Sequence, residues 1–310
     1  MRRPLTRQAG MSLIELMIAL VIGSILMIGA ITVYTQSRAN YIVNESVARL
    51  QENARFAMDF LEPDLRLASF WGQTSRSNLV EVPAPPVVMN DCAAGWAVNV
   101  FANVTGSNNV YPWACGAFNG NPQLGSDTLE VRHVGPGIAP PQAGLIQIQS
   151  NRARGGILFS NGIPPALPNS QTNNLVVSGY YVAQDSVLGV GVPSLRSQSL
   201  LFGPSIVDLE VIPGVQDLQV QFGVDRNADG TVERYVNPGD PLITFGAPGF
   251  DPNARITVAR IFLLMRAERL ELGFTDTNNY VFADRNLGPF NDGFRRLLVS
   301  KTITLRNARL

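Results

Sequence analysis

The sequence predicts an α+β protein. A long N-terminal helix, apolar in its first half and amphipathic in its second, is expected to pack on an antiparallel β-sheet within a large, loop-rich β body. Three observations support this prediction: residues 11–34 are apolar, no proline occurs between Pro4 and Pro63, and branched or alternating apolar stretches fill the C-terminal half. The chain of 310 residues is 45% apolar and 15% charged, which is a globular composition.

The apolar run at 11–34 is long enough to cross a membrane, because its helix would exceed the roughly 30 Å of a bilayer's hydrocarbon core. Three arginines and no acidic residue precede it, so the N-terminus is expected in the cytoplasm and the body outside. The run contains one acid, Glu15. A secretory signal peptide cut near Ala30 would have a shorter apolar region. In a plain membrane anchor, Glu15 would be only a penalty.

Residues 10–15, GMSLIE, resemble the type IV prepilin signal. The resemblance implies that a prepilin peptidase cuts between Gly10 and Met11 and that the new amine of Met11 is methylated. It also implies that the apolar helix is kept, first as an inner-membrane anchor and later in a filament core. Glu15 occupies the family's fifth mature position. Because a buried carboxylate needs a partner, we expect Glu15 to pair with the Met11 amine of the same or a neighbouring subunit.

After the apolar run, small and apolar residues recur at helical spacing while most charged residues fall elsewhere. The stripe consists of Val47, Leu50, Ala54, Ala57, Leu61, Leu65 and Ala68. The pattern predicts one helix from about Ser12 to Ala68, with its second half packed on the body. Pro63 is expected to kink this helix or break its last turn.

The expected segments are a cleaved leader at 1–10, a membrane and filament-core helix at 11–34, an amphipathic helix at 35–72 and a periplasmic or extracellular β-rich body at 73–310. Strands in the body are expected at 128–134, 144–150, 174–183, 199–212, 215–225, 254–270 and 295–310. The stretch 254–270 also allows a helix, but its branched residues favour a strand.

The two cysteines, Cys92 and Cys115, lie in the expected body. In an exported chain such a pair is typical of a disulfide, which here would close a loop of about 22 residues and contribute roughly 3 kcal/mol. The alternative is two unpaired buried thiols. The single histidine, His133, stands in an expected strand, where a structural role is favoured.

The stretch 225–236, DRNADGTVERYV, has oxygen-bearing side chains at alternate positions before a glycine. It matches the opening of an EF-hand loop, but Val236 replaces the bidentate glutamate at the twelfth position. The candidate Ca²⁺ ligands are Asp225, Asn227, Asp229 and Glu233. Two interpretations remain open: a Ca²⁺ site, or a polar turn that these residue types favour for backbone reasons. No other cofactor is expected.

No further constellation indicates chemistry. The formal net charge is zero, which argues against nucleic-acid binding. Nucleophile-elbow, P-loop, HExxH and dinucleotide motifs are absent from the sequence, so no enzyme is expected. Asp208 and Glu210 lie on one face of an expected strand, but that spacing is common.

Four blocks of the chain resemble PilW-type minor pilins, namely 66–72, 214–230, 256–268 and 295–307. The resemblance implies a pilin-like fold and a minor pilin that primes a type IV pilus within a tip complex. It implies other minor pilins, the major pilin, prepilin peptidase, inner-membrane lipid and a large tip adhesin as partners. The expected location is the inner membrane and then the pilus tip. The alternatives are a J-type minor pseudopilin of type II secretion and a membrane-anchored adhesion module.

Overall fold

The computed structural model describes residues 10–307, so most of the expected leader lies outside the described residues. The chain divides into two compact units, the first ending at Ala48 and the second beginning at Arg49. Helix α1, Leu13–Leu67, contributes residues to both units. Each unit is described by itself.

The first unit contains the apolar part of α1. Its large apolar side chains, from Leu13 to Tyr34, are each more than half exposed. Within residues 10–307, α1 is the one helix that is long and apolar enough to cross a membrane, judged by length and composition alone. An apolar surface of this size requires lipid or other helices around it.

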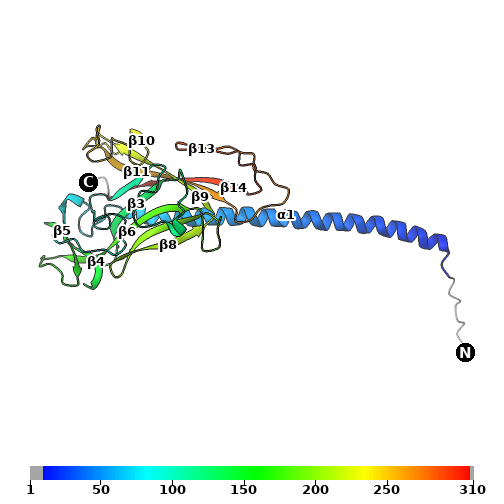
Figure 1. Cartoon of the computed structure of the whole chain (residues 1–310), viewed down its shortest axis with the longest axis horizontal. Helices are drawn as coiled ribbons and strands as arrows, with labels where there is room; N and C mark the ends of the chain where they lie inside the picture. Colours follow the sequence, from blue (N-terminus) through cyan, green and yellow to red (C-terminus); the bar gives the residue numbers. More distant parts are fainter. Residues whose placement is uncertain (1–9, 308–310) are drawn as a thin grey trace, which may run out of the picture. The chain divides into compact units, whose positions relative to one another are not determined.

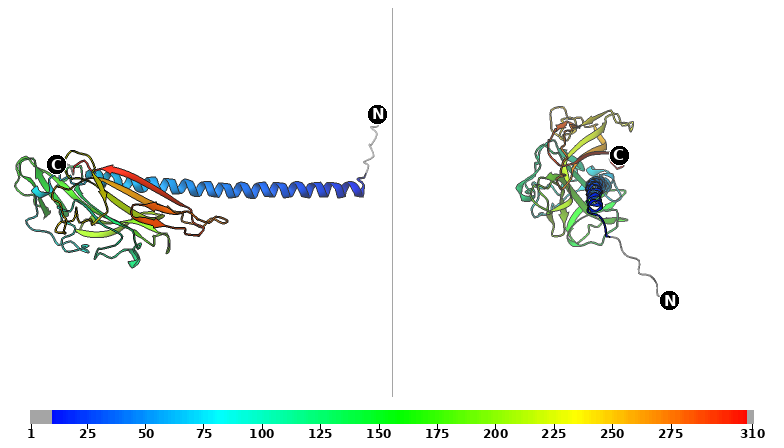
Figure 2. Two further views of the ribbon diagram at one scale, coloured as in Figure 1. Left: turned by 90° about the horizontal axis from the view of Figure 1, so that it is seen from above. Right: turned by 90° about the vertical axis from the view of Figure 1, so that its right-hand side faces the viewer.

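The second unit buries one face of α1. Leu50, Ala54, Ala57, Leu61 and Leu65 are at most 5% exposed, so the stripe predicted from the sequence is confirmed for these residues. The charged side chains on the opposite face are exposed. Viewed along the helix axis, the strands of this unit curve around α1 (Figure 2).

The helix continues through Pro63 and ends at Leu67, so the expected break at Pro63 is wrong, whereas the alternative of a kink stays a prediction. Leu61 and Leu65, on either side of the proline, are fully buried, and their packing holds the helix together there. The end comes where Ser69 adopts a left-handed φ of 65°, which turns the chain out of the helix. The helical segment expected to reach residue 72 is therefore shorter.

Three sheets make up the rest of the described body (Figure 1). The eight-stranded sheet has the order β1-β5-β4-β6-β3-β2, and β7 joins β6 while β8 joins β7. Its strands are β1 (Val80–Glu81), β2 (Val104–Ser107), β3 (Thr128–Val134), β4 (Ala143–Asn151), β5 (Gly155–Asn161), β6 (Gln171–Ala183), β7 (Ser194–Leu201) and β8 (Ser205–Pro213). β1 pairs with β5 in parallel, and the remaining pairings in this sheet are antiparallel.

The four-stranded sheet is antiparallel, with the order β10-β9-β11-β14. Its strands are β9 (Val215–Asp225), β10 (Arg234–Val236), β11 (Arg255–Arg266) and β14 (Arg296–Thr304). A small hairpin pairs β12 (Tyr280–Phe282) with β13 (Arg285–Leu287), and two short 3₁₀ helices occur at Ser77–Leu79 and Phe118–Gly120. The helix therefore packs on largely antiparallel sheets, as the sequence predicts.

Most expected strands correspond to observed ones, including β11, which is a strand and not a helix. The stretch 199–212 forms parts of two strands, β7 and β8, because a turn at 202–204 interrupts it. Pro204 has no N–H to donate to a ladder, and Gly203 has a φ of 140°. β5 was not expected, since its sequence GGILFSN offers only a short apolar run.

Two buried clusters form the core of the second unit. The first surrounds the buried face of α1 and draws residues from β3 and β6 of one sheet and from β9, β11 and β14 of the other. The second lies around the disulfide loop and contains Trp71, Trp96 and Trp113 together with residues of β4, β5 and β6. The helix thus joins the two larger sheets through one shared core.

Candidate assembly and processing site

The expected cleavage point lies just ahead of α1. Gly10 and Met11 are both exposed and precede the first helical residue, Leu13. Nothing lies within 4 Å of the position that a Cβ atom on Gly10 would take. The Gly10–Met11 bond is therefore accessible, but cleavage there stays a prediction.

Ser12 and Glu15 form a reciprocal cap at the start of α1. The backbone N–H of Glu15 donates to Ser12 Oγ at 3.2 Å, and the backbone N–H of Ser12 donates to Glu15 Oε2 at 3.2 Å. This is the capping-box pattern, in which two N–H groups left unpaired at a helix start are satisfied together. The carboxylate of Glu15 therefore already has a polar partner in the unprocessed chain.

The same geometry places the carboxylate beside the bond that is expected to be cut. Ser12 N, which contacts Glu15 Oε2, directly follows Met11 in the chain. Cleavage after Gly10 would turn the nitrogen of Met11 into a charged amine one residue away. A pair between this amine and Glu15 within one subunit is thus within reach, alongside the expected pair between subunits.

The disulfide predicted from the sequence is confirmed. Cys92 and Cys115 are joined, and both are buried. Ala114 N–H donates to the carbonyl of Cys92 at 2.7 Å, and the Tyr111 hydroxyl donates to the carbonyl of Cys115 at 2.5 Å. The crosslink is thus part of a hydrogen-bonded loop.

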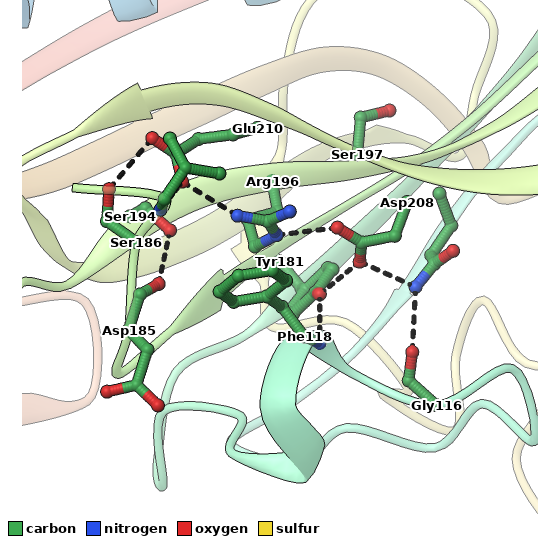
Figure 3. Close-up of polar contacts among 12 residues, drawn as sticks. Gly116, Phe118, Tyr181, Asp185, Ser186, Ser194, Arg196, Ser197, Asp208 and Glu210 are labelled. Atoms are coloured by element: carbon green, nitrogen blue, oxygen red, sulfur yellow. Dashed lines mark hydrogen bonds and ion pairs between the residues drawn. The ribbon is translucent and has the colours of Figure 1, made fainter. Parts of the chain in front are cut away.

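A buried polar network lies where this loop meets the sheet (Figure 3). Arg196 on β7 is 3% exposed and pairs with two carboxylates of β8, Asp208 at 2.6 Å and Glu210 at 2.7 Å. Its guanidinium group also lies 3.8 Å from the ring centroid of Phe118, which follows the disulfide loop. Two acids facing one arginine keep the buried charge compensated.

Tyr181 on β6 links the segment that follows the disulfide loop to the same network. Its hydroxyl donates to Asp208 and accepts the backbone N–H of Phe118 at 2.8 Å. Burial raises the pKa of Tyr181 well above its usual value, so the hydroxyl stays protonated. Gln198 completes the network through Asp208 and the carbonyl of Gly116. The sequence places Asp208 and Glu210 on one face, but only the pairing of β7 with β8 supplies Arg196.

His133 has a structural role. It is 3% exposed on β3, and its ring nitrogens contact the carbonyl of Val134 at 2.9 Å and Asp64 of α1 at 3.4 Å. The Tyr180 hydroxyl donates to the same carboxylate at 2.5 Å. Asp64 thus ties the last turns of α1 to β3 and β6.

The loop at 225–236 shows the hydrogen bonds of a polar turn. Asp225 accepts the N–H of Ala228 at 2.7 Å and the N–H of Gly230 at 2.8 Å, and Asp229 accepts the N–H of Thr231 at 2.7 Å. Within residues 10–307 no three acidic, histidine or cysteine side chains are grouped so that they fit a metal ion. Glu233 is exposed, outside these bonds. Ca²⁺ binding by this loop stays a prediction.

Comparison with known families matches two segments of the chain. The model described as prokaryotic N-terminal methylation motif matches residues 5–31, and the model described as type IV pilus-assembly protein W matches residues 179–307. A type IV-like pilin from Thermus thermophilus is similar in structure at 15% identity and a TM-score of 0.25, over 55% of this chain and 87% of that chain. No curated protein matches the chain significantly.

These findings identify the general class to which the protein belongs. A methylation motif, an apolar N-terminal helix and a β-rich body against its second half together make the chain a prepilin-like protein with an α+β, pilin-like fold. The C-terminal part of its body, residues 179–307, matches the type IV pilus-assembly protein W family, and residues 5–31 match the methylation motif. The two matches imply the pilus-assembly machinery and prepilin peptidase as partners.

Proposed function

We propose that this chain is a minor pilin that primes assembly of a type IV pilus as part of a minor-pilin complex at the filament tip. The observation that carries the proposal is the prepilin motif around Glu15, joined to a body whose residues 179–307 match the pilus-assembly protein W family. That body contains three sheets and long loops. Such a body suits a tip position, where no further subunit has to pack above it.

The proposed life cycle begins in the inner membrane. Residues 11–34 anchor the chain, the leader 1–10 lies in the cytoplasm, and the rest lies in the periplasm. Prepilin peptidase cuts between Gly10 and Met11, and the new amine is methylated. The apolar helix then leaves the lipid for the core of the filament, which gives its uncovered apolar surface a second apolar environment.

Glu15 acts in the assembly step. In a filament core its carboxylate is far more costly than at a membrane edge, unless a cation faces it. The Met11 amine of the same or a neighbouring subunit is the proposed cation. A subunit that enters out of register would leave Glu15 unpaired, so the pair sets the axial position.

The proposed partners are other minor pilins, the major pilin and a large tip adhesin. The apolar helix supplies the contact shared with every subunit, and the loops of the body supply contacts that only a tip complex has. Gene deletion tests the role: surface pili should be nearly lost while the major pilin still accumulates in the membrane. Normal piliation in the deletion strain would refute the priming role.

The same experiment distinguishes two alternatives. A J-type pseudopilin would block protein secretion when it is deleted and leave pili intact. An adhesion module would leave pili in place and reduce only binding to surfaces. Complementation with the intact chain controls for effects on neighbouring genes.

A further inference from the structure

A cavity of about 480 Å³ opens beside the β4–β5 hairpin. Three segments far apart in the sequence form it: the loop after α1, the hairpin tip at 151–154 and the loop at 168–169. Its lining includes Gln73, Asn151, Arg152, Arg154, Pro168 and Asn169. Figure 1 shows β4 and β5 at one end of the body.

Hydrogen bonds fix the walls of this cavity to one another. Gln73 N–H donates to Ser150 Oγ at 2.9 Å, and Asn151 Nδ2 donates to the carbonyl of Pro168 at 3.0 Å. Arg154 N–H donates to Asn151 Oδ1 at 2.7 Å and closes the hairpin tip. The cavity is therefore formed without a ligand, which reduces the entropy lost on binding.

The cavity carries uncompensated positive charge. The side chains of Arg152 and Arg154 are exposed and have neither an ion-pair nor a hydrogen-bond partner within the part of the chain that the structure describes. By contrast, Arg132, Arg196 and Arg296 each contact a carboxylate. Residues 131–184, which include β4, β5 and the hairpin tip between them, contain no Asp or Glu. The neutral net charge of the chain therefore hides a local excess of positive charge.

We propose that this cavity binds an oxyanion, the carboxylate or phosphate group of a polar molecule outside the cell. A planar guanidinium group pairs with either anion through two parallel hydrogen bonds. Gln73 and Asn169 add amide groups at the rim that can hydrogen-bond to hydroxyls of the same molecule. The activity is separate from filament priming, because none of these residues belongs to the prepilin motif or to α1.

The test compares two double variants of the full chain in a neutral detergent. Arg152→Gln with Arg154→Gln removes the proposed anion contacts. Arg269→Gln with Arg306→Gln removes the same charge from two other exposed arginines that also have no partner in the described chain. All four positions are exposed, so both variants should unfold at the wild-type temperature. Isothermal titration uses inorganic phosphate and, separately, polygalacturonate, a carboxylate polymer.

Saturable binding of at least one probe is expected for the wild type. The cavity variant should bind at least about tenfold more weakly, and the control variant within about twofold of the wild type. Binding of inorganic phosphate would show that a small free oxyanion is a sufficient ligand. Binding of polygalacturonate alone would show that the ligand is a polymeric acid. Equal weakening in both variants, or no saturable binding of either probe, would overturn the proposal.

Discussion

At the scale of single residues, Glu15 caps α1 and has a second, proposed role after cleavage. In the uncleaved chain it accepts the backbone N–H of Ser12. After cleavage a charged amine would stand one residue away from that N–H. The capping energy is only about 1 kcal/mol, which is less than the several kcal/mol that an unpaired charge costs in an apolar core. The pairing after cleavage therefore dominates the proposed role.

Glu15→Ala should leave cleavage at Gly10 intact and lower incorporation into filaments by at least about tenfold, because the Met11 amine would be buried without a partner. Immunoblots of sheared filaments against whole-cell protein measure this. Ser12→Ala is the matched control: it removes the capping hydroxyl and keeps the carboxylate. Wild-type assembly of Glu15→Ala, or an equal defect in Ser12→Ala, contradicts the pairing account.

Asp217 on β9, unlike Glu15, is an acid buried within the β body. It is 1% exposed, accepts Gln219 Nε2 at 3.0 Å and lies 3.4 Å from Arg285. Burial raises the pKa of Asp217 to about 7, and the Gln219 hydrogen bond and Arg285 offset only part of that effect. The folded protein therefore holds this proton more tightly than the unfolded chain does.

Asp217→Asn tests that linkage. As the pH rises above about 4, the carboxyl group of the unfolded chain loses its proton first, so the wild type loses stability until the pH passes about 7. The variant lacks this contribution, because the asparagine amide does not titrate. The unfolding free energy of Asp217→Asn, relative to that of the wild type, should rise by up to about 1.4 kcal/mol per pH unit in this window and then level off. Denaturant unfolding at several pH values measures it; a constant difference contradicts the raised pKa.

At the scale of elements, the β7–β8 pair holds in place the segment that follows the disulfide. Arg196 on β7 binds two acids of β8 and packs on Phe118, which lies just after Cys115 in the chain. Tyr181 of β6 accepts the backbone N–H of Phe118. The disulfide thus closes the loop at Cys115, and the polar network fixes the chain directly beyond it.

Replacing Arg196 by Met should lower the unfolding free energy by about 3–5 kcal/mol, because two carboxylates would stay behind without their cation. Arg226→Met provides the comparison. Arg226 also contacts a carboxylate, Asp251 at 2.8 Å, but its side chain is 51% exposed, so its loss should cost at most about 1 kcal/mol. Thermal and denaturant unfolding distinguish the two. Similar losses in both variants would show that burial does not set the cost.

At the scale of the whole molecule, α1 serves two environments. In the first unit of the chain, α1 is apolar and exposed. In the second unit the same helix is amphipathic, and its apolar face lies in the core shared by two sheets. In the proposed pathway the leader is removed and the helix is kept, so that α1 acts first in the membrane and later in the filament core. Processing is therefore the step on which the whole proposed pathway depends.

Gly10→Val should block cleavage, so that the leader is retained, since the peptidase is expected to require glycine before the cut. Mass spectrometry of the purified chain measures this: the wild type should begin at methylated Met11, and the variant at its unprocessed N-terminus. Gly29→Val is the control, because Gly29 also has nothing within 4 Å of its Cβ position and should be processed normally. Normal processing of Gly10→Val would show that the cut lies elsewhere.

The sequence by itself determined the features that depend on local pattern. Helical spacing predicts the stripe from Leu50 to Leu65, and strand alternation predicts the inward side of Leu218, Val220 and Phe222. The structure buries both sets, whereas the apolar run at 11–34 is exposed. The motif around Glu15 was visible because its residues are contiguous. So was the cysteine pair, because an exported chain has few other uses for it.

Only the tertiary structure decided which distant residues meet. Packing of Leu61 and Leu65 carries α1 through Pro63, where local rules predict a break. Strand pairing brings Arg196 to Asp208 and Glu210, and loop packing leaves Arg152 and Arg154 together at a cavity. These outcomes depend on contacts between residues far apart in the chain. A sequence pattern reports only the preferences of residues that are close together in the chain.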